Sequence, residues 1–232
     1  MTMNYYVGMI NEETVTYRPG FARGLSYAVL AIAVIGLVSS LIGDFAATWR
    51  YIPVVALVVT AVWAAYYWPA VTVSPFGVTI RNVTRTIELP WPSIQSIETK
   101  FALTLHTAYG NYSAWAAPAP GRAEVARMGN SKIYRSEAAG IPQSQIVGGA
   151  VRAGDLPGSN SGRAAMLVRS RWEELQQAGF LDNARLESAK PKVTWHWQLG
   201  LLLLGLALAS ILALHFGTPA YPSELIPTVV NL

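Results

Sequence analysis

The 232 residues combine 52% hydrophobic side chains with only 13% charged ones, at a mean hydropathy of +0.32. That is more apolar than an ordinary soluble domain, so the composition predicts a membrane protein. The net charge of +4 is too small to indicate a nucleic-acid binder, whose basic residues form a stripe along the phosphates. Because the chain has no cysteine, disulfides, thiolate metal sites, a cysteine nucleophile and lipid attachment through cysteine are excluded.

Three uncharged stretches are long enough to cross a bilayer, which takes roughly 20 helical residues. They predict a transmembrane hairpin at 24–68, with helices at 24–43 and 51–68, and a third helix at 195–216. Pro69 ends the second stretch, and tryptophans frame the third, as interfacial aromatic belts do. A cleaved signal peptide fits the first stretch poorly, because 23 residues that include two glutamates precede it.

The basic residues predict how these helices are oriented. The block at 71–194 carries 14 of the 17 Lys and Arg residues against nine acidic ones, a net charge of +5, whereas the tail at 217–232 carries none. Because cytoplasmic segments are enriched in Lys and Arg, residues 1–23 and the large block are expected in the cytoplasm and the tail outside. The expected location is the plasma (inner) membrane, and the positive block favours its anionic inner leaflet.

The cytoplasmic domain is expected at 69–181, and its first half alternates with a period of two. Turn signals separate six short strands, near 71–73, 78–81, 85–89, 94–98, 101–105 and 112–116. Six antiparallel strands in so short a stretch predict a curved sheet or partial barrel.

The second half of the domain predicts a long loop and a helix. Residues 118–162 are rich in Gly, Ala, Ser and Pro, and a loop of that length is typically functional or disordered, or conceals a missed element. Apolar residues then recur in steps of three and four, which predicts a helix with Ser161 as its N-cap. Gly179 is placed to end it, with Phe180 folding back onto Leu175. The polar segment 182–194 is expected to link this helix to the third span.

No enzyme motif survives inspection. The three histidines, His106, His196 and His215, are far apart in sequence and lack metal-ligand spacing, so no metal or cofactor is expected. The Gly-rich segment near Gly148 lacks the spacing of a phosphate-binding loop, and Ser161 does not lie in a nucleophile elbow. We expect neither catalysis nor a small-molecule substrate.

Two features instead indicate binding. Arg81 and Arg85 flank a turn and could contact lipid phosphates, although two solvated strand-end arginines are the more ordinary interpretation. Small residues four apart, Gly36 with Ser40 and Gly205 with Ala209, would permit close helix packing, either within the chain or against another subunit.

Three runs of residues carry a family resemblance. They are 74–82 (SPFGVTIRN), the corner at 89–94 (LPWPSI) and 114–122 (AWAAPAPGR), with Trp91, Trp115, Pro118, Gly121 and Arg122 as the motif residues. These runs resemble the bacterial pleckstrin homology (PH)-like domain of small actinobacterial membrane proteins, over roughly residues 50 to 180. The resemblance implies a PH-like domain that follows a pair of N-terminal membrane helices. Together with the third predicted helix, the expected fold is an α+β membrane protein in which a PH-like antiparallel β-domain with a C-terminal helix is inserted between transmembrane helices two and three.

The resemblance also implies a function, because PH-like folds are mostly interaction platforms. It favours a non-enzymatic accessory or assembly subunit bound to other integral membrane subunits, with a small partner of the actinobacterial respiratory bcc:aa3 supercomplex as its most specific form. The alternative is a protein of cell-envelope biogenesis that binds anionic lipid at the membrane surface. Phosphoinositide recognition of the eukaryotic kind is not expected, because the first hairpin turn, Ser74–Gly77, has no basic residue.

Overall fold

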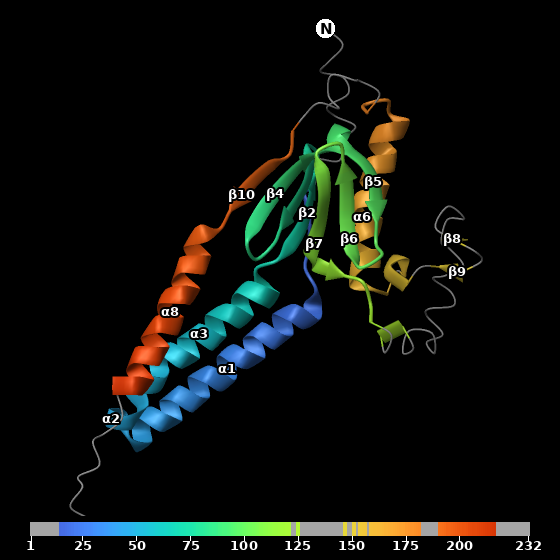
Figure 1. The fold of residues 1–232 in the computed structure, drawn as a ribbon. Helices are drawn as coiled ribbons and strands as arrows, with labels where there is room; N and C mark the ends of the chain where they lie inside the picture. The colour runs from blue at the N-terminus through green and yellow to red at the C-terminus, as the bar shows by residue number, and fades with distance from the viewer. Residues whose placement is uncertain are drawn as a thin grey trace, which may run out of the picture.

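The computed structural model describes residues 14–121, 124–125, 146–147, 150–151, 153–156, 158–181 and 190–216. A β-rich domain lies at one end of a bundle of three long helices (Figure 1). The predicted tail at 217–232 and most of the predicted linker, 182–189, lie outside the described residues.

Among the described residues, three helical segments are long and apolar enough to cross a membrane: Gly20–Gly43, Trp49–Tyr67 and Trp197–Phe216. The first is helix α1 (Gly20–Gly43), which begins four residues before the predicted start. The second combines η1 (Trp49–Tyr51), α3 (Ile52–Val62) and the π-helical turn η2 (Trp63–Tyr67). The third is α8 (Trp197–Phe216). The predicted loop between the first two is itself mostly helical, because α2 (Phe45–Thr48) fills it.

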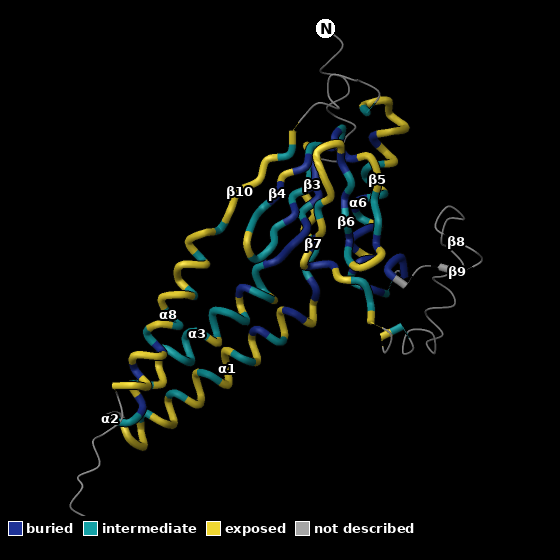
Figure 2. The backbone as a smooth tube through the Cα atoms, in the orientation of Figure 1, coloured by how far each residue is buried: buried dark blue, intermediate teal, exposed yellow. Residues whose placement is uncertain are grey.

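Many residues of the long helices α1 and α8 are exposed, whereas the β-domain encloses a buried apolar core (Figure 2). Helix α3 packs against both α1 and α8. In α1 only Ala22 and Ser26 are buried. An outer surface of this composition is suited to lipid or to another apolar helix rather than to water.

All six predicted strands are present. They are β2 (Ala70–Ser74), β3 (Gly77–Arg81), β4 (Arg85–Pro90), β5 (Ile94–Glu98), β6 (Ala102–Thr107) and β7 (Gly110–Pro118). A 3-10 turn, η3 (Trp91–Ser93), makes the corner between β4 and β5. Every paired neighbour is antiparallel, as the hairpin turns predicted.

Two short strands that the sequence did not indicate extend the first sheet. Strand β1 (Val15–Tyr17) pairs with β2, and β10 (Lys192–Trp195) pairs with β4. The described residues therefore form one sheet in the order β1-β2-β3-β4-β10 and a second in the order β5-β6-β7. This corrects two predictions, because Trp195 belongs to β10 rather than to the third helix and the end of the predicted linker is a strand.

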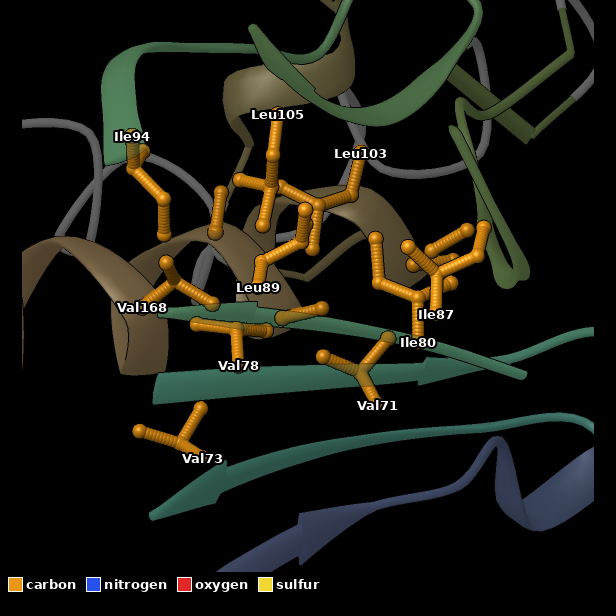
Figure 3. Close-up of a cluster of buried hydrophobic side chains, with 14 of the residues drawn as sticks. Val71, Val73, Val78, Ile80, Ile87, Leu89, Ile94, Leu103, Leu105 and Val168 are labelled. Atoms are coloured by element: carbon orange, nitrogen blue, oxygen red, sulfur yellow. The ribbon is translucent and has the colours of Figure 1, made fainter. Parts of the chain in front are cut away.

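The core lies between the two sheets and α6 (Asn160–Gln177). Figure 3 shows valine, leucine and isoleucine side chains of β2, β3 and β4 pointing toward those of the second sheet and toward Val168 of α6. Ile80, Ile87, Leu103 and Leu105 are fully buried. Each such side chain contributes about 1.5–3 kcal/mol by leaving water, so this cluster holds the sheets together.

Helix α6 begins and ends with capping motifs. Its N-cap is Ser159, whose Oγ accepts a hydrogen bond from the Gly162 amide at 2.9 Å, so the prediction of Ser161 was wrong by two residues. The Ser161 Oγ instead donates to the Gly154 carbonyl at 2.7 Å. At the other end Gly179 adopts a φ of 72°, and the Phe180 amide donates to the Leu175 carbonyl at 3.0 Å, which is the predicted Schellman arrangement.

The predicted loop at 118–162 contains regular structure. Strands β8 (Ile146–Val147) and β9 (Ala150–Val151) pair with each other, and a 3-10 turn, η5 (Ala153–Asp155), precedes α6. Asp155 of this turn is buried and bonded to Arg169 and Thr99, which fastens the end of the segment to the domain.

Candidate interaction site at the helix–sheet junction

Three strands of the first sheet run almost directly into the three long helices. Two residues separate β1 from α1, two separate η2 from β2, and one separates β10 from α8. Connections this short leave little room for a hinge. One end of the sheet is therefore held against the ends of the helix bundle at three points (Figure 1).

Arginines stack on aromatic rings along this junction. The guanidinium carbon of Arg81 lies 4.5 Å from the Trp68 ring centroid, and that of Arg18 lies 5.6 Å from the centroid of Tyr67. Arg85 lies over Trp195 in the same way, at 5.4 Å. Such stacking is attractive because the face of an aromatic ring is negative. It holds three positive charges at the end of the helix bundle.

The structure separates the two arginines that the sequence placed together. Arg81 follows the buried Ile80, so its side chain leaves the opposite face of the sheet, whereas Arg85 shares the face of the buried Ile87. The Arg81 Nε donates to the Trp68 carbonyl at 2.9 Å. Burial lowers the pKa of Arg81, and the positive charge of Arg18 lowers it further. The electrostatic neighbour of Arg81 is thus Arg18, which the sequence did not single out as a site residue.

His196 links the sheet to α8. Its Nε2 lies 3.0 Å from the Thr86 Oγ1, and its backbone amide donates to the Thr84 carbonyl at 2.8 Å. Its ring meets Trp68 edge to face, with centroids 5.7 Å apart. These contacts place His196 at the junction, where it fastens the start of α8 to β4.

The motif residue Trp115 joins β7 to the end of the second helix. Its indole Nε1 donates to the Ala65 carbonyl at 3.0 Å, and its backbone amide donates to the Asn82 Oδ1 at 2.8 Å. The same Asn82 donates from Nδ2 to the Ser113 carbonyl at 2.9 Å. Trp115 therefore ties the second sheet to the junction as well.

The remaining motif residues have separate positions. Trp91 is buried in the corner after β4, where its Nε1 donates to the Ser74 carbonyl at 2.9 Å. Pro118 ends β7, and the Gly121 carbonyl accepts from the amides of residues 124 and 125 at 3.0 Å. Arg122 lies outside the described residues.

An apolar cavity of about 510 Å³ lies beside this junction. Its walls come from the start of α1, the end of η2 and the end of β7, and they include Phe21, Tyr66 and Trp115. Several of its lining residues are alanines, among them Ala114 and Ala116 of the motif, and these small side chains leave the space open.

The predicted helix-packing residues do not all have the same surroundings. Gly36 and Ser40 line an apolar groove of about 420 Å³ between α1 and α3, and the Ser40 Oγ lies 2.8 Å from the Thr48 Oγ1. Gly205, by contrast, does not line this groove, and a Cβ atom added there would meet no atom within 4 Å. Ala209 is partly exposed on the same helix.

The described residues contain no group of three His, Cys, Asp or Glu side chains that could hold a metal ion. His106 pairs with Glu98, its Nε2 3.2 Å from the Glu98 Oε2, and its Nδ1 lies 2.9 Å from the Asn111 Oδ1. His215 meets Phe216 edge to face at the end of α8. The three histidines thus contact different partners, on β6, at the junction and at the end of α8.

A protein-family model described as a bacterial PH domain matches residues 68–140. Over these residues the chain is similar to bacterial PH domains. The match begins where the second long helix ends and includes strands β2 to β7, and it contains all three runs that carried the resemblance in the sequence. No curated protein and no solved structure matches the chain. Strands β1 and β10 of the PH-like sheet lie outside the matched segment.

Proposed function

We propose that the chain is a non-enzymatic interaction protein that holds a PH-like domain rigidly at a membrane surface. The carrying observation is the junction, where β1, β2 and β10 of one sheet each continue into a long apolar helix through one or two residues. Such a connection fixes the orientation of the domain relative to the bilayer. A domain that only had to stay near the membrane could be attached by a flexible linker, so the short connections indicate that its orientation matters.

In this proposal the three helices cross the plasma membrane, with the PH-like domain in the cytoplasm and the end of α8 outside. The charge distribution supports this orientation, because 14 of the 17 basic residues fall in the block between the second and third helices. The stacked arginines at the junction then lie at the level of the lipid headgroups on the cytoplasmic side.

The partner proposed is another integral membrane subunit. Its binding site is the groove between α1 and α3, where Gly36 and Ser40 leave about 420 Å³ of apolar space on the outside of the bundle. Transmembrane helices associate through small residues that admit a large neighbouring side chain, and this groove has that character. The most specific candidate partner, suggested by the family resemblance and by size, is the respiratory bcc:aa3 supercomplex.

The experiment tests whether a membrane protein binds in the groove and whether filling the groove prevents this binding. A photo-crosslinker attached to a cysteine at Leu37, which lines the groove, should capture one integral membrane protein in intact membranes. Cysteine labelling is specific, because the chain has no cysteine of its own. The substitution Gly36→Leu should abolish this crosslink while the protein still reaches the membrane.

The matched control is Gly205→Leu, which adds the same side chain to a helix face that does not line the groove. It should leave the crosslink intact. If the Leu37 probe captures lipid alone, or if Gly36→Leu leaves the crosslinked protein unchanged, the chain does not bind a subunit through this groove. Mass spectrometry of the captured protein decides whether it belongs to the respiratory supercomplex.

A second function, recognition of anionic lipid in cell-envelope biogenesis, is favoured by the arginines at the junction. Three of them lie where phosphates of the facing leaflet would be within reach. This function predicts binding to anionic membranes that weakens as salt is added, because salt screens exposed charges.

A further inference from the structure

Strand β1 brings a second arginine beside Arg81. Tyr17 pairs with Val71, so Arg18, the next residue, extends from β1 alongside Ala70, and Ala70 in turn pairs with Arg81 on β3. The small side chain of Ala70 separates the two arginines across the sheet. Their guanidinium groups stack on consecutive aromatic residues, Tyr67 and Trp68.

This pair of positive charges has no acidic partner in the part of the chain that the structure describes. Among the described residues, neither Arg18 nor Arg81 forms an ion pair with a carboxylate. The Nε of Arg18 is buried and donates no hydrogen bond to the described residues. Burial lowers the pKa of Arg81, and the positive charge of Arg18 lowers it further, so the charged state of Arg81 is less favourable here than in water. An oxyanion between them would relieve this repulsion and accept the free donors.

The start of α1 adds to the positive potential at this place. The helix begins at Gly20, two residues after Arg18, and its N-cap, Pro19, offers no side-chain acceptor to the first amides. Unbonded amides and the helix dipole make a helix N-terminus attractive to anions. Here they reinforce a site that the two arginines already define.

We propose that Arg18 and Arg81 together bind the phosphate of an anionic phospholipid in the leaflet that faces the PH-like domain. The inference rests on the lipid-binding function proposed above. It assigns the binding to Arg18 and Arg81 and leaves out Arg85, because Arg85 stacks on Trp195 at the other face of the sheet. The location selects a lipid because Arg18 lies two residues before the apolar helix α1, and Arg81 stacks on Trp68, the residue that follows the second apolar helix. An anionic lipid is favoured over a zwitterionic one because its headgroup adds no positive charge beside the pair.

The test measures lipid bound to the full-length protein in a neutral detergent. The protein is titrated with dioleoyl phosphatidylglycerol or dioleoyl phosphatidylcholine, and bound lipid is counted by native mass spectrometry. Phosphatidylglycerol should bind more tightly. Arg18→Gln or Arg81→Gln should each weaken its binding about fivefold, and the double variant roughly 25-fold, since one basic residue near a lipid surface contributes about 1 kcal/mol.

Arg85→Gln is the matched control, because it removes the same charge from the same junction. It should change the binding of phosphatidylglycerol by less than about twofold. Arg81→Gln also removes the hydrogen bond to Trp68, whereas the Arg18 Nε has no hydrogen-bond partner among the described residues, so Arg18→Gln tests the site without that loss. Arg18→Lys should keep most of the binding.

Three outcomes would overturn the proposal. If Arg85→Gln abolishes lipid binding and Arg18→Gln does not, the residues are wrong and the lipid-binding function stands. If phosphatidylglycerol and phosphatidylcholine bind equally to every variant, the lipid-binding function itself fails. If inorganic phosphate displaces phosphatidylglycerol at an equal concentration, the site takes a soluble phosphate and not a lipid.

Discussion

Replacing Asp155 with asparagine removes the negative charge from a buried ion pair that holds the turn η5 against the middle of α6. The Asp155 Oδ1 lies 2.8 Å from the Arg169 Nη1, and the two side chains are only 5% and 19% exposed. The same oxygen accepts a hydrogen bond from the Thr99 Oγ1 at 2.7 Å. Asparagine keeps the size of the side chain and can still accept from Thr99, so the variant isolates the charge.

The expected cost follows from what Arg169 loses. Removing one partner of a fully buried ion pair costs about 3–5 kcal/mol, because the other charge stays buried without compensation. Arg169 keeps a long contact, 3.4 Å from its Nη2 to the Ile97 carbonyl, and it is partly exposed to water. We therefore expect Asp155→Asn to lower the free energy of opening of α6 by about 2–3 kcal/mol, which raises the open population about 30- to 160-fold.

Cysteine labelling can measure this opening in the full chain. Val168 lies fully buried on α6 and the chain has no native cysteine, so Val168→Cys reacts with a maleimide only when α6 opens. The labelling rate should rise about 30-fold or more when Asp155→Asn is added. The control is Glu174→Gln, which removes the charge of the largely exposed Glu174 from its pair with Arg171 and should change the rate by less than about threefold. If Asp155→Asn gives no more than the control does, the ion pair does not anchor α6.

Three further changes test other parts of the structure. Gly154→Ala should raise the maleimide labelling rate of Val168→Cys, because the added Cβ would overlap the Thr99 carbonyl oxygen. Gly121→Ala, in open space, should not raise it. Equal rates in the two variants would contradict the close approach of Gly154 to Thr99. Burial is the main cause that raises the pKa of Tyr17 above 10.0. The unfolded chain therefore loses the phenol proton at a lower pH than the folded chain does. As a result, the stability that Tyr17 contributes is fully present below pH 10 and falls above it. Thermal unfolding should show that Tyr17→Phe reduces the loss of stability at alkaline pH, and an identical loss would refute the burial argument. Trp115→Phe removes the indole hydrogen bond to the second helix, which is worth about 1 kcal/mol. The distribution of distances between spin labels on α3 and β7 should then become broader. An unchanged distribution would mean that this bond does not position the sheet.

The six central strands could be predicted because their signal is local. Residues such as Val71, Val73, Val78 and Ile80 alternate with polar ones, and this alternation places one face of each strand in the core. Turn residues between the strands then limit the pairing to neighbours in sequence. The apolar face of these strands requires a partner, but the sequence pattern does not say which one. In the structure the second sheet and α6 cover this face.

Strands β1 and β10 could not be predicted, because their signal is not local. They contain three and four residues, and β10 is exposed along its whole length, so neither has an apolar face that recurs. They form strands because they pair with β2 and β4 of the folded sheet. Trp195 illustrates the resulting error, since an aromatic residue beside an apolar run is also what an interfacial belt contains.

The candidate site was predicted only in part, for the same reason. Nearness in sequence suggested Arg81 with Arg85, but the alternation of the strands sends them to opposite faces of the sheet. The pairing of β1 with β2 supplies Arg18 instead, from a point more than 60 residues earlier in the chain. Sequence patterns give the faces of a strand, whereas neighbours across a sheet depend on the register.

The two edge strands also determine how the domain responds to the helices. Strand β10 pairs with β4 over four residues and is followed after one residue by α8, so a partner that displaces α8 must either move the sheet with it or break that pairing. His196 opposes the break, because its ring and amide both bond to β4 and the turn before it. Strand β1 connects α1 to the opposite edge in the same way. A rearrangement of the helices is therefore expected to reach the PH-like domain as a shear between the edges of its first sheet, and Arg18, which directly follows the edge strand β1, would then move relative to Arg81 on the central strand β3.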